Sequence, residues 1–249
     1  MLHGRTWSAL PNFDLQVSGQ HVSTMDALVA QGYAVYALDQ RGYGSTPRDA
    51  TGWLTPNRAA RDAENVVDWV TDRAPGKRRP VLFGYSRGSA TVMLAAQRVP
   101  SKISGLILYG FYYDITNPPE KVDEPEQPPR AKTTKEAAAE DFITPESTPR
   151  GVKEAYVRDA VRTTPVRPDW RKEEQFAELD PAKITVPTLV INGERDPIAS
   201  AAELPVFFSQ VGTVDKWWIV LENADHVAHL ERTNAFVQAL TSFMARPKR

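Results

Sequence analysis

Short, almost uninterrupted apolar runs recur along the chain. They lie at Tyr33–Leu38, Pro80–Phe83, Ile103–Tyr109, Thr188–Ile191 and Lys216–Leu221. Strands buried on both faces have this character, because neither side of a covered parallel sheet meets water. The runs therefore predict the strands of a buried, mostly parallel sheet.

Between these runs, hydrophobic residues recur at helical spacing. Helices are predicted over Thr24–Gln31, Asn57–Arg73, Ser89–Val99 and Ala235–Met244. Strands that alternate with helices form right-handed βαβ units, in which helices cover both faces of a parallel sheet. The pattern predicts an α/β fold with a mostly parallel central sheet flanked by helices.

One long stretch breaks the alternation. The residues from about Asp114 to Pro187 hold 11 of the 20 prolines, with an acidic, proline-rich run at Pro118–Pro129. Short helical patterns, without a strand pattern, follow near Lys135–Phe142, Arg150–Arg162 and Trp170–Leu179. We therefore expect a helical, proline-rich cap or lid at residues 114–184, inserted into a core domain formed by residues 1–113 and 185–249.

Composition narrows the class of protein. The 249 residues carry 30 Lys and Arg against 31 Asp and Glu, so no basic field indicates a nucleic acid as partner. No apolar run approaches the length of a transmembrane segment. Met1–Gly4 lacks the charged and apolar regions of a signal peptide, so a cytoplasmic location is expected.

The chain offers no signal for a cofactor. It contains no cysteine, which excludes a disulfide and a thiolate metal site. No histidine–carboxylate cluster has metal-ligand spacing, and no glycine-rich loop matches a dinucleotide or phosphate-binding pattern. We expect no metal and no cofactor.

The motif Gly84-Tyr85-Ser86-Arg87-Gly88 stands between a predicted strand and a predicted helix. An abrupt strand-to-helix turn holds its corner residue in a strained conformation, with the side chain exposed at the carboxyl edge of the sheet. Glycine on either side lets the turn close tightly. Ser86 is therefore the candidate nucleophile. The Arg87 amide, at the start of the helix, is a candidate oxyanion donor.

These residues, with four other motifs, make the chain resemble the α/β-hydrolase superfamily in its capped, esterase-like branch with a serine nucleophile. The motifs follow one another in the family's order: Leu2-His3-Gly4, Leu38–Ser45, Gly84–Gly88, Asn192–Pro197 and Ala224-Asp225-His226. The conjunction is more specific than any one of the motifs. The resemblance covers most of the chain.

The resemblance implies a triad. His226, after the last predicted strand, matches the catalytic histidine, and His229 is the alternative. Asp196 matches the acid that orients this histidine, and Asp114 is its rival. The chain order is then Ser86, Asp196, His226, as expected of this fold.

The resemblance also implies a second oxyanion donor, the Arg5 amide, beside that of Arg87. Two readings of the Arg5 and Arg87 side chains stay open. If the two side chains face the pocket, they favour an anionic substrate. If they point away and pair with carboxylates, their role is structural. The expected substrate pocket is lined by Trp7, Tyr85, Phe111, Tyr112 and Trp170.

The implied activity is hydrolysis of a small-molecule carboxylic ester through an acyl-enzyme on Ser86. An acyltransferase, a C–C bond hydrolase or perhydrolase with the same triad, and a non-catalytic ligand-binding protein are the alternatives. The chain departs from the family at its start, because only two residues precede His3 and the usual N-terminal strands are absent. An open sheet edge favours association, so a homodimer is expected.

Overall fold

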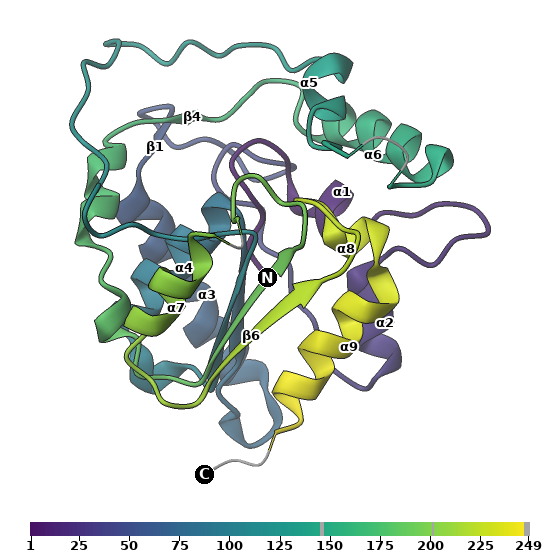
Figure 1. Cartoon of the computed structure of the whole chain (residues 1–249). Helices are drawn as coiled ribbons and strands as arrows, with labels where there is room; N and C mark the ends of the chain where they lie inside the picture. Colours follow the sequence, from purple (N-terminus) through teal and green to yellow (C-terminus); the bar gives the residue numbers. More distant parts are fainter. Residues whose placement is uncertain (145–146, 201, 247–249) are drawn as a thin grey trace.

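A parallel four-stranded sheet forms the centre of the molecule (Figure 1). The computed structural model describes residues 1–144, 147–200 and 202–246. In spatial order the strands are β2 (Val81–Tyr85), β3 (Gly105–Tyr109), β5 (Thr188–Gly193) and β6 (Lys216–Leu221). Each strand coincides with an apolar run of the sequence, so the predicted α/β fold is confirmed.

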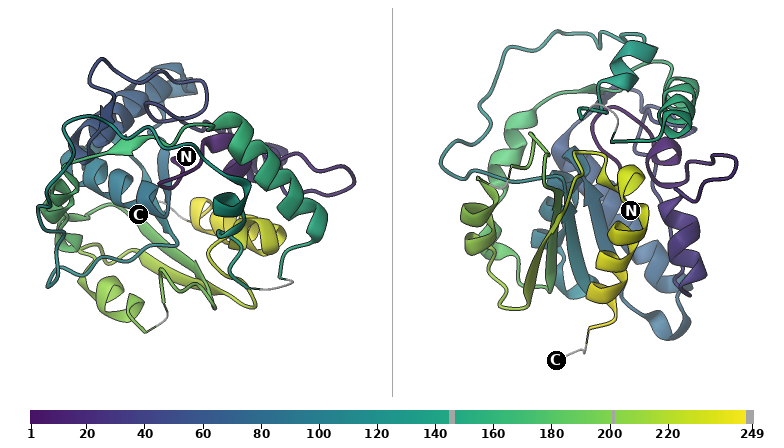
Figure 2. Two further views of the ribbon diagram at one scale, coloured as in Figure 1. Left: turned by 90° about the horizontal axis from the view of Figure 1, so that it is seen from above. Right: turned by 45° about the vertical axis from the view of Figure 1, so that its right-hand side comes forward.

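Alternate residues of the strands pack into two hydrophobic cores, one on each face of the sheet. On β3, Leu106 and Leu108 face a cluster that includes residues of α3 (Pro56–Arg73) and α4 (Arg87–Arg98). Ile107 and Tyr109 face the opposite cluster, to which other helices contribute. Among these helices are α1 (Ala9–Phe13), α2 (Thr24–Ala30) and α9 (Thr233–Met244). Helices thus cover both faces of the sheet (Figure 2), which explains why its strands are apolar throughout.

The remaining regular elements are short. Two helices, α7 (Leu204–Gln210) and α8 (Ala228–Glu231), flank β6 along the chain. Single 3₁₀ turns lie at η1 (Pro75–Lys77), η2 (Pro100–Lys102) and η4 (Pro181–Lys183). No helix within the described residues has both the length and the apolar character needed to cross a membrane.

The chain between β3 and β5 passes over the carboxyl ends of the strands (Figure 1). It carries α5 (Lys135–Ala139) and α6 (Arg150–Thr163), close to the predicted helical segments. Their buried residues, Tyr156 among them, pack in one cluster with Trp7 and Leu15 of the N-terminal region. This cluster fastens the segment to the rest of the molecule.

The expected helix at Trp170–Leu179 is wrong. Asp169–Trp170 forms a two-residue strand, β4, that pairs in parallel with β1 (Trp53–Leu54), and a 3₁₀ helix, η3, follows at Glu173–Glu178. The Trp170 and Phe176 rings stack at a centroid separation of 6.3 Å. Tertiary packing, and not a continuous helix, brings them together.

The predicted strand at Tyr33–Leu38 is an extended segment with a single bridge. Leu2 forms parallel bridges with both Leu38 and Gly84, and its amide donates to the Phe83 carbonyl over 2.8 Å. Beyond Leu2, a cavity of about 610 Å³ separates this segment from β2. Among the described residues, the segment has no ladder partner along that cavity, so it does not form a regular strand.

Candidate active site

Ser86 occupies the corner between β2 and α4. Its backbone is in the left-handed region, with φ 52° and ψ −125°, an uncommon conformation for a residue other than glycine. Gly84 and Gly88 allow the corner to close. A Cβ at Gly84 would lie 2.5 Å from the Ser89 Cα, and one at Gly88 would lie 2.4 Å from the His3 carbonyl oxygen. The sequence therefore places a serine where the backbone stores strain.

The corner is held by hydrogen bonds from both sides. The Ser86 amide donates to the Tyr109 carbonyl over 2.8 Å. The Ser89 hydroxyl donates to the Gly84 carbonyl over 2.7 Å and accepts from the Tyr109 amide at 3.1 Å. These bonds tie the corner to the neighbouring strand β3, so the strained conformation is fixed by the fold.

His226 and Asp196 form a hydrogen-bonded pair in the same region. The two residues are 5 % and 2 % exposed, and the His226 Nδ1 atom lies 2.9 Å from the Asp196 Oδ2 atom. The other oxygen of Asp196 accepts from the amides of Ile198 and Ala199, at 2.9 and 3.2 Å. These two amides fix the orientation of the carboxylate. Because Asp196 engages the Nδ1 atom of His226, the Nε2 atom is the ring nitrogen available to act as a base.

Neither alternative from the sequence occupies this position. His229 is buried beside Tyr109, with 3.0 Å between its Nδ1 atom and the Tyr109 hydroxyl oxygen. Burial lowers the pKa of His229 to about 3, so the ring is neutral. Asp114 is exposed, and its carboxylate accepts from the amide and hydroxyl of Thr116.

The loop His3–Arg5 lies against the corner. His3 is buried and accepts from the Gln40 amide through Nε2 at 3.2 Å, and burial lowers its pKa to about 4. A Cβ at Gly4 would lie 3.3 Å from the Ser86 Cβ, so glycine permits this close approach. The Tyr43 hydroxyl donates to the Arg5 carbonyl. The loop that carries the Arg5 amide is therefore fixed next to Ser86.

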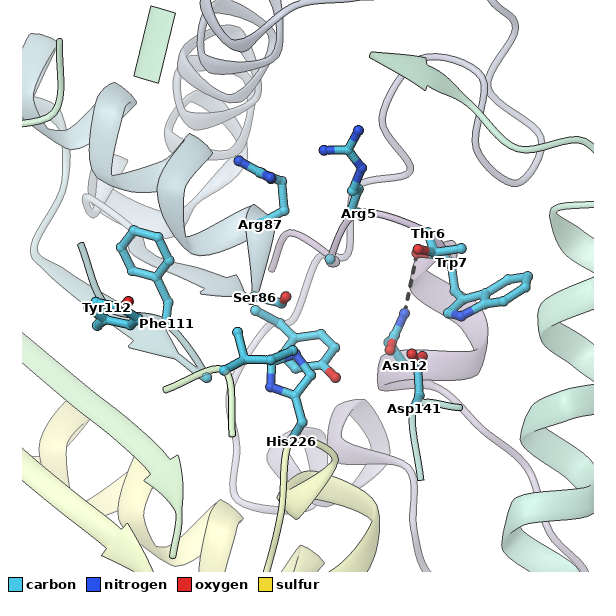
Figure 3. A pocket seen from close by; sticks show the side chains of 14 residues that line it. Arg5, Thr6, Trp7, Asn12, Ser86, Arg87, Phe111, Tyr112, Asp141 and His226 are labelled. Carbon is cyan, nitrogen blue, oxygen red and sulfur yellow. Dashed lines mark hydrogen bonds between the residues drawn. The ribbon is translucent and has the colours of Figure 1, made fainter. Parts of the chain in front are cut away.

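A cavity of about 420 Å³ opens above Ser86 and His226 (Figure 3). Four of the residues expected in the pocket line it, namely Trp7, Tyr85, Phe111 and Tyr112. Further lining residues, which were not among those expected in the pocket, are Gly4, Thr6, Asn12, Gly110, Asp141 and Ile198.

Trp170, the fifth residue expected in the pocket, does not line this cavity. It is buried, and its indole Nε1 donates to the Tyr43 hydroxyl over 2.8 Å. The β4–β1 pairing directs the ring toward Tyr43, the residue that holds the Arg5 carbonyl. Trp170 thus supports the His3–Arg5 loop indirectly, through its hydrogen bond to Tyr43.

The side chains of Arg5 and Arg87 lie on the same side of the cavity, above Ser86 (Figure 3). Both pair with the same oxygen of Glu173, at 2.6 Å for Arg5 Nη1 and 3.0 Å for Arg87 Nη2. Both residues also line the cavity. The two readings left open by the sequence are therefore compatible, since the guanidinium groups are paired with a carboxylate while both residues line the cavity.

Asp141 comes from the segment after α5 and faces the cavity on the side of Asn12 (Figure 3). The Tyr156 hydroxyl donates to it over 2.7 Å. Burial raises the pKa of this carboxyl group, and the nearby His226 opposes the rise. No motif marks Asp141, because its proximity to His226 depends on how the inserted segment folds back.

The Asp225 carboxylate, next to His226, is fully buried. It accepts from the amides of Thr144 and Val227, at 2.7 and 2.9 Å. These bonds join the inserted segment to the loop of His226. Within the described ranges, no group of three or more His, Asp or Glu side chains is arranged to hold a metal ion.

Comparison with known proteins identifies the class. The chain belongs to the α/β-hydrolases, and within them to the family described as serine aminopeptidase, S33, whose model matches residues 16–233. The resemblance seen in the sequence is thus confirmed. The matched residues include Ser86, Asp196 and His226 and begin after the His3–Arg5 loop. A search of curated protein sequences finds no match to this chain.

Solved structures of low sequence identity share the fold. A serine hydrolase involved in carbazole degradation is 18% identical, with a TM-score of 0.68, over 98% of this chain and 89% of that one. A methylesterase from Arabidopsis is 17% identical, with a TM-score of 0.67, over 98% and 96%. A meta-cleavage product hydrolase from Pseudomonas fluorescens is 16% identical, with a TM-score of 0.62, over 98% and 88%.

Proposed function

We propose that this member of a hydrolase family cleaves carboxylic esters of small molecules through an acyl-enzyme on Ser86. The observation that carries the proposal is the strained Ser86 corner beneath the cavity that His226 also lines, with Asp196 bonded to the histidine. Ester-cleaving enzymes among the structures of similar fold are consistent with this reaction. The proposal needs no metal and no cofactor.

The mechanism begins with proton transfer. The Nε2 atom of His226 takes the Ser86 proton while the serine oxygen attacks the ester carbonyl. Asp196 accepts from Nδ1, which keeps Nε2 free as the base and stabilises the imidazolium that forms. The imidazolium then protonates the departing alcohol. Water, activated in turn by His226, attacks the acyl-enzyme and releases the acid.

The negative charge of the tetrahedral intermediate develops on the former carbonyl oxygen. We assign the Arg87 and Arg5 amides as its donors. The Arg87 amide is at the first residue of α4, where helix geometry leaves amides without an intrahelical acceptor. The position of Gly4 against Ser86 supports the assignment of Arg5.

Hydrolysis of 4-nitrophenyl acetate, butyrate and octanoate by the wild type and by Ser86→Ala tests the proposal. Intact mass after treatment with a fluorophosphonate reports the nucleophile. We expect turnover and a single adduct, both lost in Ser86→Ala. A folded wild-type protein that gives neither turnover nor adduct refutes the proposal.

The same assay separates the alternatives. An acyltransferase gives transfer product when an alcohol acceptor is added, and a C–C bond hydrolase or perhydrolase needs its own substrates. A ligand-binding protein is stabilised by ligands without product release. An amino-acid 4-nitroanilide belongs in the panel, because the description of the family names aminopeptidases.

Three expectations accompany the proposal. Residues 114–184 act as a cap over a core of residues 1–113 and 185–249, and limited proteolysis tests these boundaries. A homodimer stays a prediction that size-exclusion chromatography decides. A cytoplasmic location likewise stays a prediction, to be tested by fractionation of cells.

A further inference from the structure

Two arginines that line the cavity, Arg5 and Arg87, share one carboxylate, Glu173. Arg5 and Arg87 each follow a residue of the reaction centre, Gly4 and Ser86, and their side chains converge on Glu173. The three side chains are 35 %, 30 % and 25 % exposed, so the cluster is only half-buried. Of its members, Arg5 and Arg87 line the cavity. Among the residues that the structure describes, Glu173 is the one carboxylate paired with either guanidinium group.

This arrangement leaves one positive charge without a counter-charge. Burial is the main reason that the pKa of Arg87 is lowered, and repulsion from Arg5 adds to it, whereas Glu173 opposes the shift. The Arg87 guanidinium also lies over the Phe176 ring, 5.2 Å from its centroid, so an apolar surface backs it. A partly desolvated cation of this kind is stabilised by a second carboxylate.

We propose that this cluster is an anion subsite, and that the substrate is an ester bearing a carboxylate a few bonds from the scissile carbonyl. A substrate carboxylate would complete an alternating set of two guanidinium groups and two carboxylates. Guanidinium groups suit this role, because each presents several fixed donors and keeps others free after one is used. The inference rests on the proposed ester hydrolysis, whose substrate class it specifies.

The opposite side of the cavity sets the orientation of the substrate. Asp141 and Asn12 lie there, away from the two arginines (Figure 3). The Asn12 amide nitrogen donates to the Ser8 carbonyl over 2.8 Å. An anionic group next to the Asp141 carboxyl would be repelled when that carboxyl is ionised. The charged end of the substrate is therefore expected against Arg5 and Arg87.

A matched pair of esters tests the subsite. One is the mono(4-nitrophenyl) ester of glutaric acid, and the other is 4-nitrophenyl 5-methylhexanoate, in which an isopropyl group replaces the carboxylate. We expect the wild type to favour the glutarate ester in kcat/KM by about tenfold or more, from charge-assisted hydrogen bonds. Comparing 4-acetoxybenzoate with phenyl acetate shows instead whether the carboxylate belongs to the leaving group.

Three variants make the test specific. Arg87→Gln should abolish the preference for the anionic ester, whereas Glu173→Gln should increase it, because the competing carboxylate is removed. Arg171→Gln is the matched control. Arg171 lies over the Trp53 ring and outside the cavity, so its replacement should leave the preference unchanged.

Equal kcat/KM for the two esters of both pairs, unmoved by Arg87→Gln and Glu173→Gln, overturns the subsite while leaving ester hydrolysis intact. The subsite is also tested without turnover. Free glutarate should raise the melting temperature of Ser86→Ala, and should not do so when Arg87→Gln is added. No stabilisation of Ser86→Ala by glutarate refutes the anion site, whereas loss of turnover on every ester refutes the proposed function.

Discussion

Gly88→Ala is the most direct test of how the oxyanion loop is placed. A Cβ at this position would lie 2.4 Å from the His3 carbonyl oxygen and 2.6 Å from the Leu2 carbonyl oxygen. Both contacts are with backbone, so no side chain can rotate away to relieve them. Either the Leu2–His3 backbone or the start of α4 must move.

The size of the shift follows from the distances. Reaching an ordinary contact of about 3.4 Å from 2.4 Å requires a movement of about 1 Å. Overpacking of this kind costs about 1–3 kcal/mol, which lowers the melting temperature of a chain of this size by about 2–12 °C. Since Gly4 and Arg5 follow directly, a displacement of about 1 Å is expected to reduce kcat about 100-fold.

The measurement combines urea denaturation with ester hydrolysis. Gly151→Ala in α6 is the control, because its Cβ would meet the Gln20 side chain at an ordinary 3.4 Å. Restricting the unfolded chain makes that change stabilising by about 0.4–1 kcal/mol, with normal activity. If Gly88→Ala matches the wild type in both stability and kcat, the close packing of the loop on α4 does not govern catalysis.

Three further predictions concern the residues around this loop and the triad. Asp196→Asn should reduce kcat about 10⁴-fold in hydrolysis of 4-nitrophenyl butyrate, because the orienting carboxylate is lost while the shape is kept; a loss below tenfold contradicts its role. Tyr43→Phe removes the hydroxyl that donates to the Arg5 carbonyl and should reduce kcat about tenfold with KM nearly unchanged; a change in KM alone would point to a binding role. The pKa of His229 is about 3 in the folded protein, against 6.5 for an unperturbed histidine. Its contribution to the free energy of unfolding is therefore complete above pH 6.5 and is lost as the pH falls toward 3. His229→Gln should therefore reduce the slope of the urea-derived free energy of unfolding against pH in that window, by up to about 1.4 kcal/mol per pH unit. An unchanged slope would show that His229 is not the responsible group.

Much of the fold follows from local patterns. The apolar runs at β2, β3, β5 and β6 predict buried strands, and the structure places a strand at each. The signal is strong because a strand covered on both faces admits almost no polar residue. Tyr33–Leu38 is just as apolar, but a strand also needs a neighbouring strand with which to form hydrogen bonds. The apolar composition of a segment does not predict whether such a partner is present.

The inserted segment shows the opposite case. Its short helices α5 and α6 were predicted, whereas β4 was missed because a two-residue strand leaves no alternation to detect. Trp170 was expected in the pocket from its position on this segment. The pairing of β4 with β1 directs it to Tyr43 instead.

The sequence by itself determined the candidate chemistry. A serine between Gly84 and Gly88 at a strand-to-helix corner is a local feature, because the strain and the exposed hydroxyl depend on adjacent residues. Asp196 and His226 were assigned through the resemblance to the α/β-hydrolases, with Asp114 and His229 as alternatives. Ser86, Asp196 and His226 each follow a strand, and the carboxyl ends of parallel strands meet at one edge of the sheet.

Only the tertiary structure decided which side chains surround that chemistry. Asp141 and Glu173 belong to no motif, yet the first faces the cavity and the second joins Arg5 to Arg87. The contacts of Glu173 with Arg5 and Arg87 join residues more than 80 positions apart along the chain, and charge pairing over such separations is set by how the inserted segment packs. Short stretches of sequence thus specify the reacting groups. The arrangement of charged side chains that would select a substrate arises only when distant segments of the chain fold together.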